Sequence, residues 1–149
     1  MRIVDDNAVN RDILCRLAKR WGRAATAVDS GPEALRLLDA QQARGAEPFD
    51  VVLLDMQMPG MDGIAVAERL RELSVPSRVL AYSAYDDAAY VTAMLQAGAA
   101  GYVTKDKPMS LVAEAVEAVA RGEGRWFVSI TPPNPVEIPI SERELDVVR

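Results

Sequence analysis

The sequence of 149 residues contains no histidine and only one cysteine, Cys15. Without histidine, the chain cannot form a Ser-His-Asp triad, a Cys-His pair or a histidine-ligated metal site, and it cannot carry a phosphohistidine. A single cysteine excludes an internal disulfide, which fits a reducing compartment. We therefore expect a cytoplasmic protein.

Long apolar runs and excess positive charge are also missing. No apolar run approaches the ~20 residues that a membrane-spanning helix needs, and the first residues are too few and too acidic for a signal peptide. We expect no membrane partner. The formal net charge is −5, which argues against nucleic-acid binding by the chain itself, because such binding relies on Lys and Arg contacts with phosphates.

Short apolar runs alternate with stretches of helical period along most of the chain. The runs that predict strands are Ile3–Val4, 24–28, 51–54, 79–82 and 100–103. Apolar residues between them recur every three or four positions, as in helices packed on one face. Five strand-helix units with apolar strands predict an α/β fold, a doubly wound five-stranded parallel sheet with helices on both faces.

Local signals predict where these helices begin and end. Ser30 to Glu33 has the spacing of a capping box, with proline in the first turn. Asp62 and Asp86 stand at expected N-caps, and Gly98 and Gly122 where helices should stop.

The chain changes character after residue 122. Residues 129–140 hold four of the nine prolines, which excludes a helix and indicates an extended linker. Ser141 to Glu144 forms another capping box, followed by the start of an apolar stripe. We therefore predict a first domain over 1–122, a linker over 123–140, and the start of a second domain over 141–149.

Polar side chains stand at the carboxyl ends of four predicted strands. Asp5 and Asp6 follow the first strand, Asp55 the third, Ser83 the fourth and Lys105 the fifth. Ligands of open α/β sheets bind at this edge. The five side chains are therefore expected to form one site.

This set of residue types has a definite chemistry. Three carboxylates at close range favour a hard divalent cation, Mg²⁺ or Mn²⁺. Lys105 suits a phosphoryl oxygen rather than a metal, and the Ser83 hydroxyl can donate to another such oxygen. Asp55, activated in this way, could act as a nucleophile and form an aspartyl phosphate.

These residues resemble the receiver domain of two-component response regulators. The resemblance covers residues 2 to about 122, and its motifs are Val4-Asp5-Asp6-Asn7, residues 53–63 (LLDMQMPGMDG), Ser83-Ala84 and residues 101–106 (GYVTKD). It implies the flavodoxin-like (CheY-like) strand order 2-1-3-4-5, here with a short central first strand. Residues 120–126 and 140–145 resemble the NarL/LuxR-type (FixJ-like) transcriptional regulators, cut off at the start of their helix-turn-helix domain.

The resemblance also implies how the acidic residues act. Asp55 would be the phosphoryl acceptor. Mg²⁺ (or Mn²⁺) would be held by Asp5, Asp6, Asp55 and the backbone carbonyl of Gln57. The chain would then be a phosphoacceptor switch rather than an enzyme, catalysing at most its own phosphorylation and dephosphorylation.

The remaining residues of this edge would bind the phosphate and respond to it. The phosphate-binding residues implied by the resemblance are Ser83, Ala84 and Lys105, and the switch pair is Ser83 with Tyr102. The donor would be a sensor histidine kinase, and phosphorylation would promote a homodimer. Transcription would be regulated through the missing C-terminal DNA-binding domain.

Three alternatives stay open. A phosphatase of the haloacid-dehalogenase type would share the strand-end Asp but needs an acid two residues later, where this chain has Gln57. A flavodoxin-like cofactor binder would need a Gly- and hydroxyl-rich loop where Asp5-Asp6-Asn7 stands. A stand-alone receiver would act through protein contacts alone, and the capping box at Ser141 argues against it.

Overall fold

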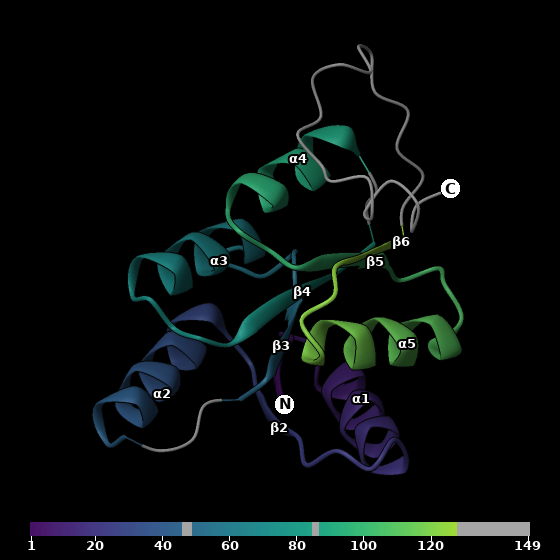
Figure 1. Ribbon diagram of the computed structural model, residues 1–149, viewed down its shortest axis with the longest axis horizontal. Coiled ribbons are helices and arrows are strands. Elements are labelled where there is room, and N and C mark those ends of the chain that lie inside the picture. Colours follow the sequence, from purple (N-terminus) through teal and green to yellow (C-terminus); the bar gives the residue numbers. More distant parts are fainter. Residues whose placement is uncertain (46–48, 85–86, 128–149) are drawn as a thin grey trace.

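The computed structural model describes residues 1–45, 49–84 and 87–127 (Figure 1). Its strands are β1 (Arg2–Val4), β2 (Thr26–Val28), β3 (Val51–Asp55), β4 (Arg78–Ser83), β5 (Gly101–Thr104) and β6 (Arg125–Phe127). Its helices are α1 (Ala8–Arg20), α2 (Gly31–Ala43), α3 (Gly63–Glu72), α4 (Ala88–Gln96) and α5 (Met109–Ala120). The predicted helix cap at Asp86 and the predicted segment 129–149 lie outside the described residues.

The strands form one parallel sheet in the order β2-β1-β3-β4-β5-β6. The predicted order of the first five strands is confirmed, but the prediction of five strands was wrong. Arg125–Phe127 adds a sixth strand beside β5. It can do so because Gly101 has no side chain: a Cβ there would overlap the Arg125 carbonyl oxygen.

Helices cover both faces of this sheet, as its apolar strands predict. Figure 1 shows α1 and α5 on one side, and α2, α3 and α4 on the other. Two buried clusters fill the spaces between helices and sheet. One includes Ile3, Leu53 and Val103 with residues of α1 and α5, and the other includes Val4 and Leu54 with residues of α2, α3 and α4. Side chains of successive strand residues therefore alternate between the two faces.

Most predicted helix ends are confirmed by their contacts. The Ser30 hydroxyl accepts a hydrogen bond from the Glu33 backbone N–H (3.3 Å), and an Asp62 carboxylate oxygen accepts one from Ala65 N–H (2.9 Å). Gly98 and Gly122 follow α4 and α5 with φ angles of 89° and 87°, which glycine adopts without strain. No described helix has the length and apolar character needed to cross a membrane.

Candidate functional site

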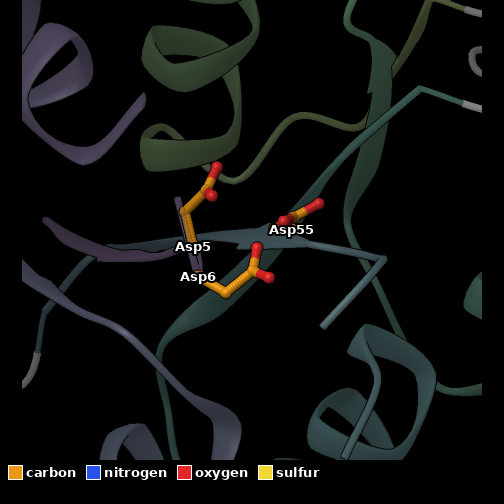
Figure 2. A group of neighbouring side chains, drawn as sticks. All are labelled: Asp5, Asp6 and Asp55. Carbon is orange, nitrogen blue, oxygen red and sulfur yellow. The ribbon is translucent and has the colours of Figure 1, made fainter. Parts of the chain in front are cut away.

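Three carboxylates meet where β1 and β3 end. Asp5 and Asp6 follow β1, Asp55 is the last residue of β3, and one oxygen of each lies within 4.8 Å of the others. Figure 2 shows the three side chains side by side at this edge. Asp5 and Asp55 are 1% and 3% exposed, whereas Asp6 is exposed. Two of the acids are thus held inside the protein, and the third faces solvent.

Lys105 brings a positive charge to these acids. Its Nζ lies 3.2 Å from Asp55 Oδ1 and 3.8 Å from Asp5 Oδ2. Its backbone N–H donates to the Ser83 carbonyl oxygen over 2.7 Å, which ties the segment after β5 to the end of β4. The ammonium group therefore approaches the acids from a fixed backbone position.

The site holds more negative charge than Lys105 neutralises. The pKa of Asp55 is raised to about 6, first because the carboxyl is buried and then because Asp5 is near, while Lys105 acts in the opposite direction. Asp5 Oδ2 is buried and accepts no hydrogen bond from any described residue. Buried carboxylate oxygens of this kind are the ligands that Mg²⁺ or Mn²⁺ takes in proteins. The donor set therefore fits a hard divalent cation.

The turn after β1 holds Asp5 in place. Asn7 N–H donates to Asp5 Oδ1 (2.9 Å), and Arg11 Nη1 donates to the Asp5 carbonyl oxygen (2.8 Å). The Asn7 side chain also caps α1, accepting hydrogen bonds from the backbone N–H groups of Val9 and Asn10. One asparagine thus joins the start of α1 to the acidic cluster. This role of Asn7 was not predicted, although asparagine before a helix is a recognisable cap signal.

Ser83 and Gln57 lie on the other side of Asp55. Gln57 N–H donates to Asp55 Oδ1 (3.3 Å), and the Ser83 hydroxyl donates to Gln57 Oε1 (3.4 Å). Ser83 is fully buried, whereas Ala84, the next residue, is exposed. An open cavity of about 450 Å³ adjoins this side of the site, and it is lined by Asp6, Met56, Gln57, Met58, Pro59, Asp62 and Tyr90.

Two residues near Lys105 have contacts for which the sequence predicted no role. The Tyr82 ring lies under the ammonium group, with Nζ 5.4 Å from the ring centroid. Tyr82 pairs with Asp55 across β3 and β4. Because side chains alternate between the two faces of a sheet, counting residues along both strands could have placed Tyr82 on the same face as Asp55. Asp106 accepts a hydrogen bond from the Thr104 hydroxyl (2.5 Å), which closes the turn that carries Lys105.

The structure thus brings together Asp5, Asp6, Asp55, Ser83 and Lys105, as the strand-end argument predicts. Tyr102 does not belong to this group. Tyr102 lies within β5, and its side chain belongs to the buried cluster beneath α2, α3 and α4, with none of its surface exposed.

Comparisons with known proteins agree with this geometry. The family model "Response regulator receiver domain" matches residues 1–117. The "Probable transcriptional regulatory protein NarL" of Mycobacterium tuberculosis is 38% identical over 120 residues, which are 79% of this chain and 53% of that protein. The chain thus spans about half the length of the curated relatives it matches.

Solved structures give the same result. The signal receiver domain of the M. tuberculosis NarL protein has a TM-score of 0.70 at 37% identity, covering 82% of this chain and 95% of that one. A LuxR-family response regulator from Aurantimonas has a TM-score of 0.72 at 29% identity, with 92% of each chain covered. The receiver domain of the Arabidopsis thaliana histidine kinase CKI1, solved with Mg²⁺ and BeF₃⁻, has a TM-score of 0.68 at 27% identity, covering 80% and 88%. This chain therefore belongs to the family of response regulator receiver domains.

Proposed function

We propose that this chain accepts a phosphoryl group on Asp55 and changes conformation in response. The observation that carries the proposal is the position of the Asp55 carboxylate, at a strand end with Lys105 Nζ at 3.2 Å and two further carboxylates close by. A receiver domain is a phosphoacceptor switch, which supports this assignment. Its donor would be a phosphohistidine on a sensor histidine kinase, since the chain has no histidine of its own.

The transfer is a substitution at phosphorus. An Asp55 oxygen forms the new bond to phosphorus while the bond from phosphorus to the donor's imidazole nitrogen breaks. The electron pair of that bond leaves with the imidazole, which takes a proton from solvent. Lys105 pairs with a phosphoryl oxygen as charge develops on it, and the Ser83 hydroxyl turns from Gln57 toward another. The backbone of the adjoining Ala84 would bind the same phosphate.

Asp5, Asp6 and Asp55 would hold Mg²⁺, with the Gln57 carbonyl as a further ligand. The bound cation supplies positive charge that offsets repulsion between the carboxylates and the incoming phosphoryl oxygens. The buried Asp5 Oδ2, which has no hydrogen-bond donor among the described residues, supports this role. The CKI1 receiver domain solved with Mg²⁺ supports it by analogy.

Intact mass after incubation with acetyl phosphate and Mg²⁺ tests the proposal. The native chain should gain the mass of one phosphoryl group, and EDTA should prevent the gain. The variant Asp55→Asn should gain nothing, because its amide is a poor nucleophile. Asp39→Asn, the same change on the exposed side of α2, is the matched control and should be modified like the native chain. Modification of Asp55→Asn would contradict the assignment.

We further propose that residues 141–149 begin a helix-turn-helix domain through which the full-length protein binds DNA and regulates transcription. The predicted linker 123–140 would connect this domain to the receiver, although its residues Arg125–Phe127 belong to the sheet as β6. The name of the M. tuberculosis relative supports this output.

Phosphorylation of the full-length protein should favour a homodimer. An unchanged sedimentation coefficient after complete phosphorylation would contradict the homodimer.

A further inference from the structure

Trp126 of β6 packs directly against Tyr102 of β5. The two residues are partners in the parallel register, their ring centroids are 6.2 Å apart, and their planes differ by 20°. Both side chains are almost completely buried, with 1% and 0% of their surface exposed. Tyr102 therefore has an aromatic neighbour from a strand that follows all the other elements of the sheet.

The backbone of β5 is shaped to receive this strand. A Cβ on Gly101 would overlap the Arg125 carbonyl oxygen and lie 2.9 Å from Leu80 Cδ1. Arg125 N–H donates to the Ala100 carbonyl oxygen (3.2 Å) at the point where β6 begins. The docking of β6 thus depends on features of β5 that are independent of the two aromatic rings.

The same strand β5 is tied to the phosphorylation site. Thr104 pairs with Ser83 in the register of β4 and β5, and Lys105 N–H donates to the Ser83 carbonyl oxygen. Tyr102 precedes Thr104 by two residues, so both side chains lie on the same face of the sheet. A movement of Ser83 or Lys105 toward a phosphoryl group would therefore displace β5, the strand that carries Tyr102.

The indole of Trp126 does not satisfy all of its bonding capacity in this arrangement. Its Nε1–H is buried and has no hydrogen-bond acceptor among the described residues. A buried donor without an acceptor is costly. If β6 moved to a position where Nε1–H met a protein acceptor or water, part of this unfavourable free energy would be removed.

We propose that Trp126 is a positioning residue for Tyr102, and that β6 carries the phosphorylation state of the site into the chain that follows Phe127. This inference rests on the proposed function of Asp55. Packing of Trp126 holds the Tyr102 ring in the interior. When Ser83 and Lys105 bind the phosphoryl group, the shift of β5 changes the stack, and β6 changes its docking with it.

The fluorescence of Trp126 tests this coupling. The chain has two tryptophans, and Trp21→Phe leaves Trp126 as the single reporter. We expect acetyl phosphate with Mg²⁺ to shift its emission to longer wavelength and increase its quenching by acrylamide, because a side chain that is 1% exposed can only become more accessible. Intact mass measured in parallel should show the same time course.

Three variants separate this role from general packing. In Trp126→Phe, the remaining Trp21 lies in the cluster on the opposite face and should not respond. In the Trp21→Phe background, Tyr102→Phe keeps the ring and should keep the response of Trp126. Tyr102→Leu removes the ring and should still be phosphorylated, but the emission shift should fall to less than half.

The outcomes separate the inference from the proposal on which it rests. Full incorporation of phosphate without any change in Trp126 emission would overturn the inference and leave Asp55 as the acceptor. An equal response of Tyr102→Leu and Tyr102→Phe would also overturn it. Failure of the native chain to take up phosphate would contradict the proposed function, and the role of Trp126 with it.

Discussion

The two faces of the sheet differ in chemistry at the same edge. On the face covered by α1 and α5, the strands end in Asp5 and Asp55, and Lys105 reaches toward both. On the face covered by α2, α3 and α4, the buried side chains that β4, β5 and β6 place near this edge are neutral, and the acid found there, Asp6, is exposed. The neutral side chains are Ser83, Thr104, Tyr102 and Trp126.

This separation follows from the alternation of side chains along a strand. Ser83 is the last residue of β4, and its neighbour Tyr82 points to the face that carries the charges, as the two clusters indicate. The Ser83 hydroxyl still reaches the loop after Asp55 through Gln57. The proposed phosphorylation would thus add charge on one face while its effect reached the other, and Ser83 lies between them.

Ionisation of Asp55 on the charged face should lower the free energy of unfolding as pH rises. This is the largest effect that we expect. The pKa of Asp55 is about 6 in the folded chain, against an ordinary value of 3.8 for an aspartate carboxyl in water. The folded state therefore binds the proton more tightly, and the free energy of unfolding should fall as pH rises from about 4 to 6 and then level off. In metal-free buffer, Asp55→Asn should remove this fall and be more stable by up to about 3 kcal/mol at pH 7.

Urea unfolding of both proteins between pH 4 and pH 8 measures the difference. Asp39→Asn should keep the pH dependence of the native chain, because that carboxyl lies on the exposed side of α2. Saturating Mg²⁺ should stabilise the native chain more than Asp55→Asn, since a cation that binds the folded state adds to stability. Parallel pH profiles for the native chain and Asp55→Asn would contradict the conclusion that the buried Asp55 carboxylate destabilises the fold.

The charged face could be predicted from the sequence to a large extent. Each of its residues follows a short apolar run, and parallel strands bring their carboxyl ends to one edge. Asp5, Asp55 and Lys105 therefore meet as the sequence predicts. Roles such as metal ligand or phosphate ligand stay predictions, since distances within the protein do not identify what it binds.

The neutral face was harder to predict. Trp126 stands in a three-residue strand, which is too short to show an alternation of apolar and polar residues. It also lies within the predicted linker 123–140, just before the proline-rich stretch. The decisive signal was Gly101, which reads from the sequence as one more glycine in an Ala-Gly-rich segment. Its meaning becomes clear only when Arg125 lies against it, because close approach of two backbones is a tertiary property.

On the neutral face, we expect the largest loss of stability from a substitution at the contact between Gly101 and Arg125. A methyl group in Gly101→Ala has to displace Arg125 and Leu80, so we expect a loss of about 1–3 kcal/mol of stability together with increased exposure of Trp126. Gly22→Ala is the control. Gly22 has a φ of 76° and no neighbour within 4 Å, so alanine there should cost about 1–2 kcal/mol through backbone strain alone.

Trp126 fluorescence distinguishes the two glycine variants even when their stabilities are equal. In the Trp21→Phe background, acrylamide quenching should increase in Gly101→Ala and stay unchanged in Gly22→Ala. Unchanged quenching in both would mean that β6 remains docked without the space that Gly101 provides.

The smallest effect should come from Tyr82, on the charged face. Its ring contacts the Lys105 ammonium at 5.4 Å, a cation–π contact of about 0.5–1 kcal/mol. Tyr82→Leu should loosen Lys105 and slow the phosphorylation of Asp55 by acetyl phosphate about two- to fivefold. Tyr82→Phe keeps the ring and should react like the native chain.

A double-mutant cycle with Lys105→Gln assigns this effect to the ring-ammonium contact. If Tyr82 acts by holding Lys105, Tyr82→Leu should slow the native chain and leave the rate of Lys105→Gln unchanged. Equal slowing in both backgrounds would place the role of Tyr82 in packing alone. The two tyrosines would then differ: Tyr102 would serve the transmission of a signal, and Tyr82 only the integrity of the core beneath α1 and α5.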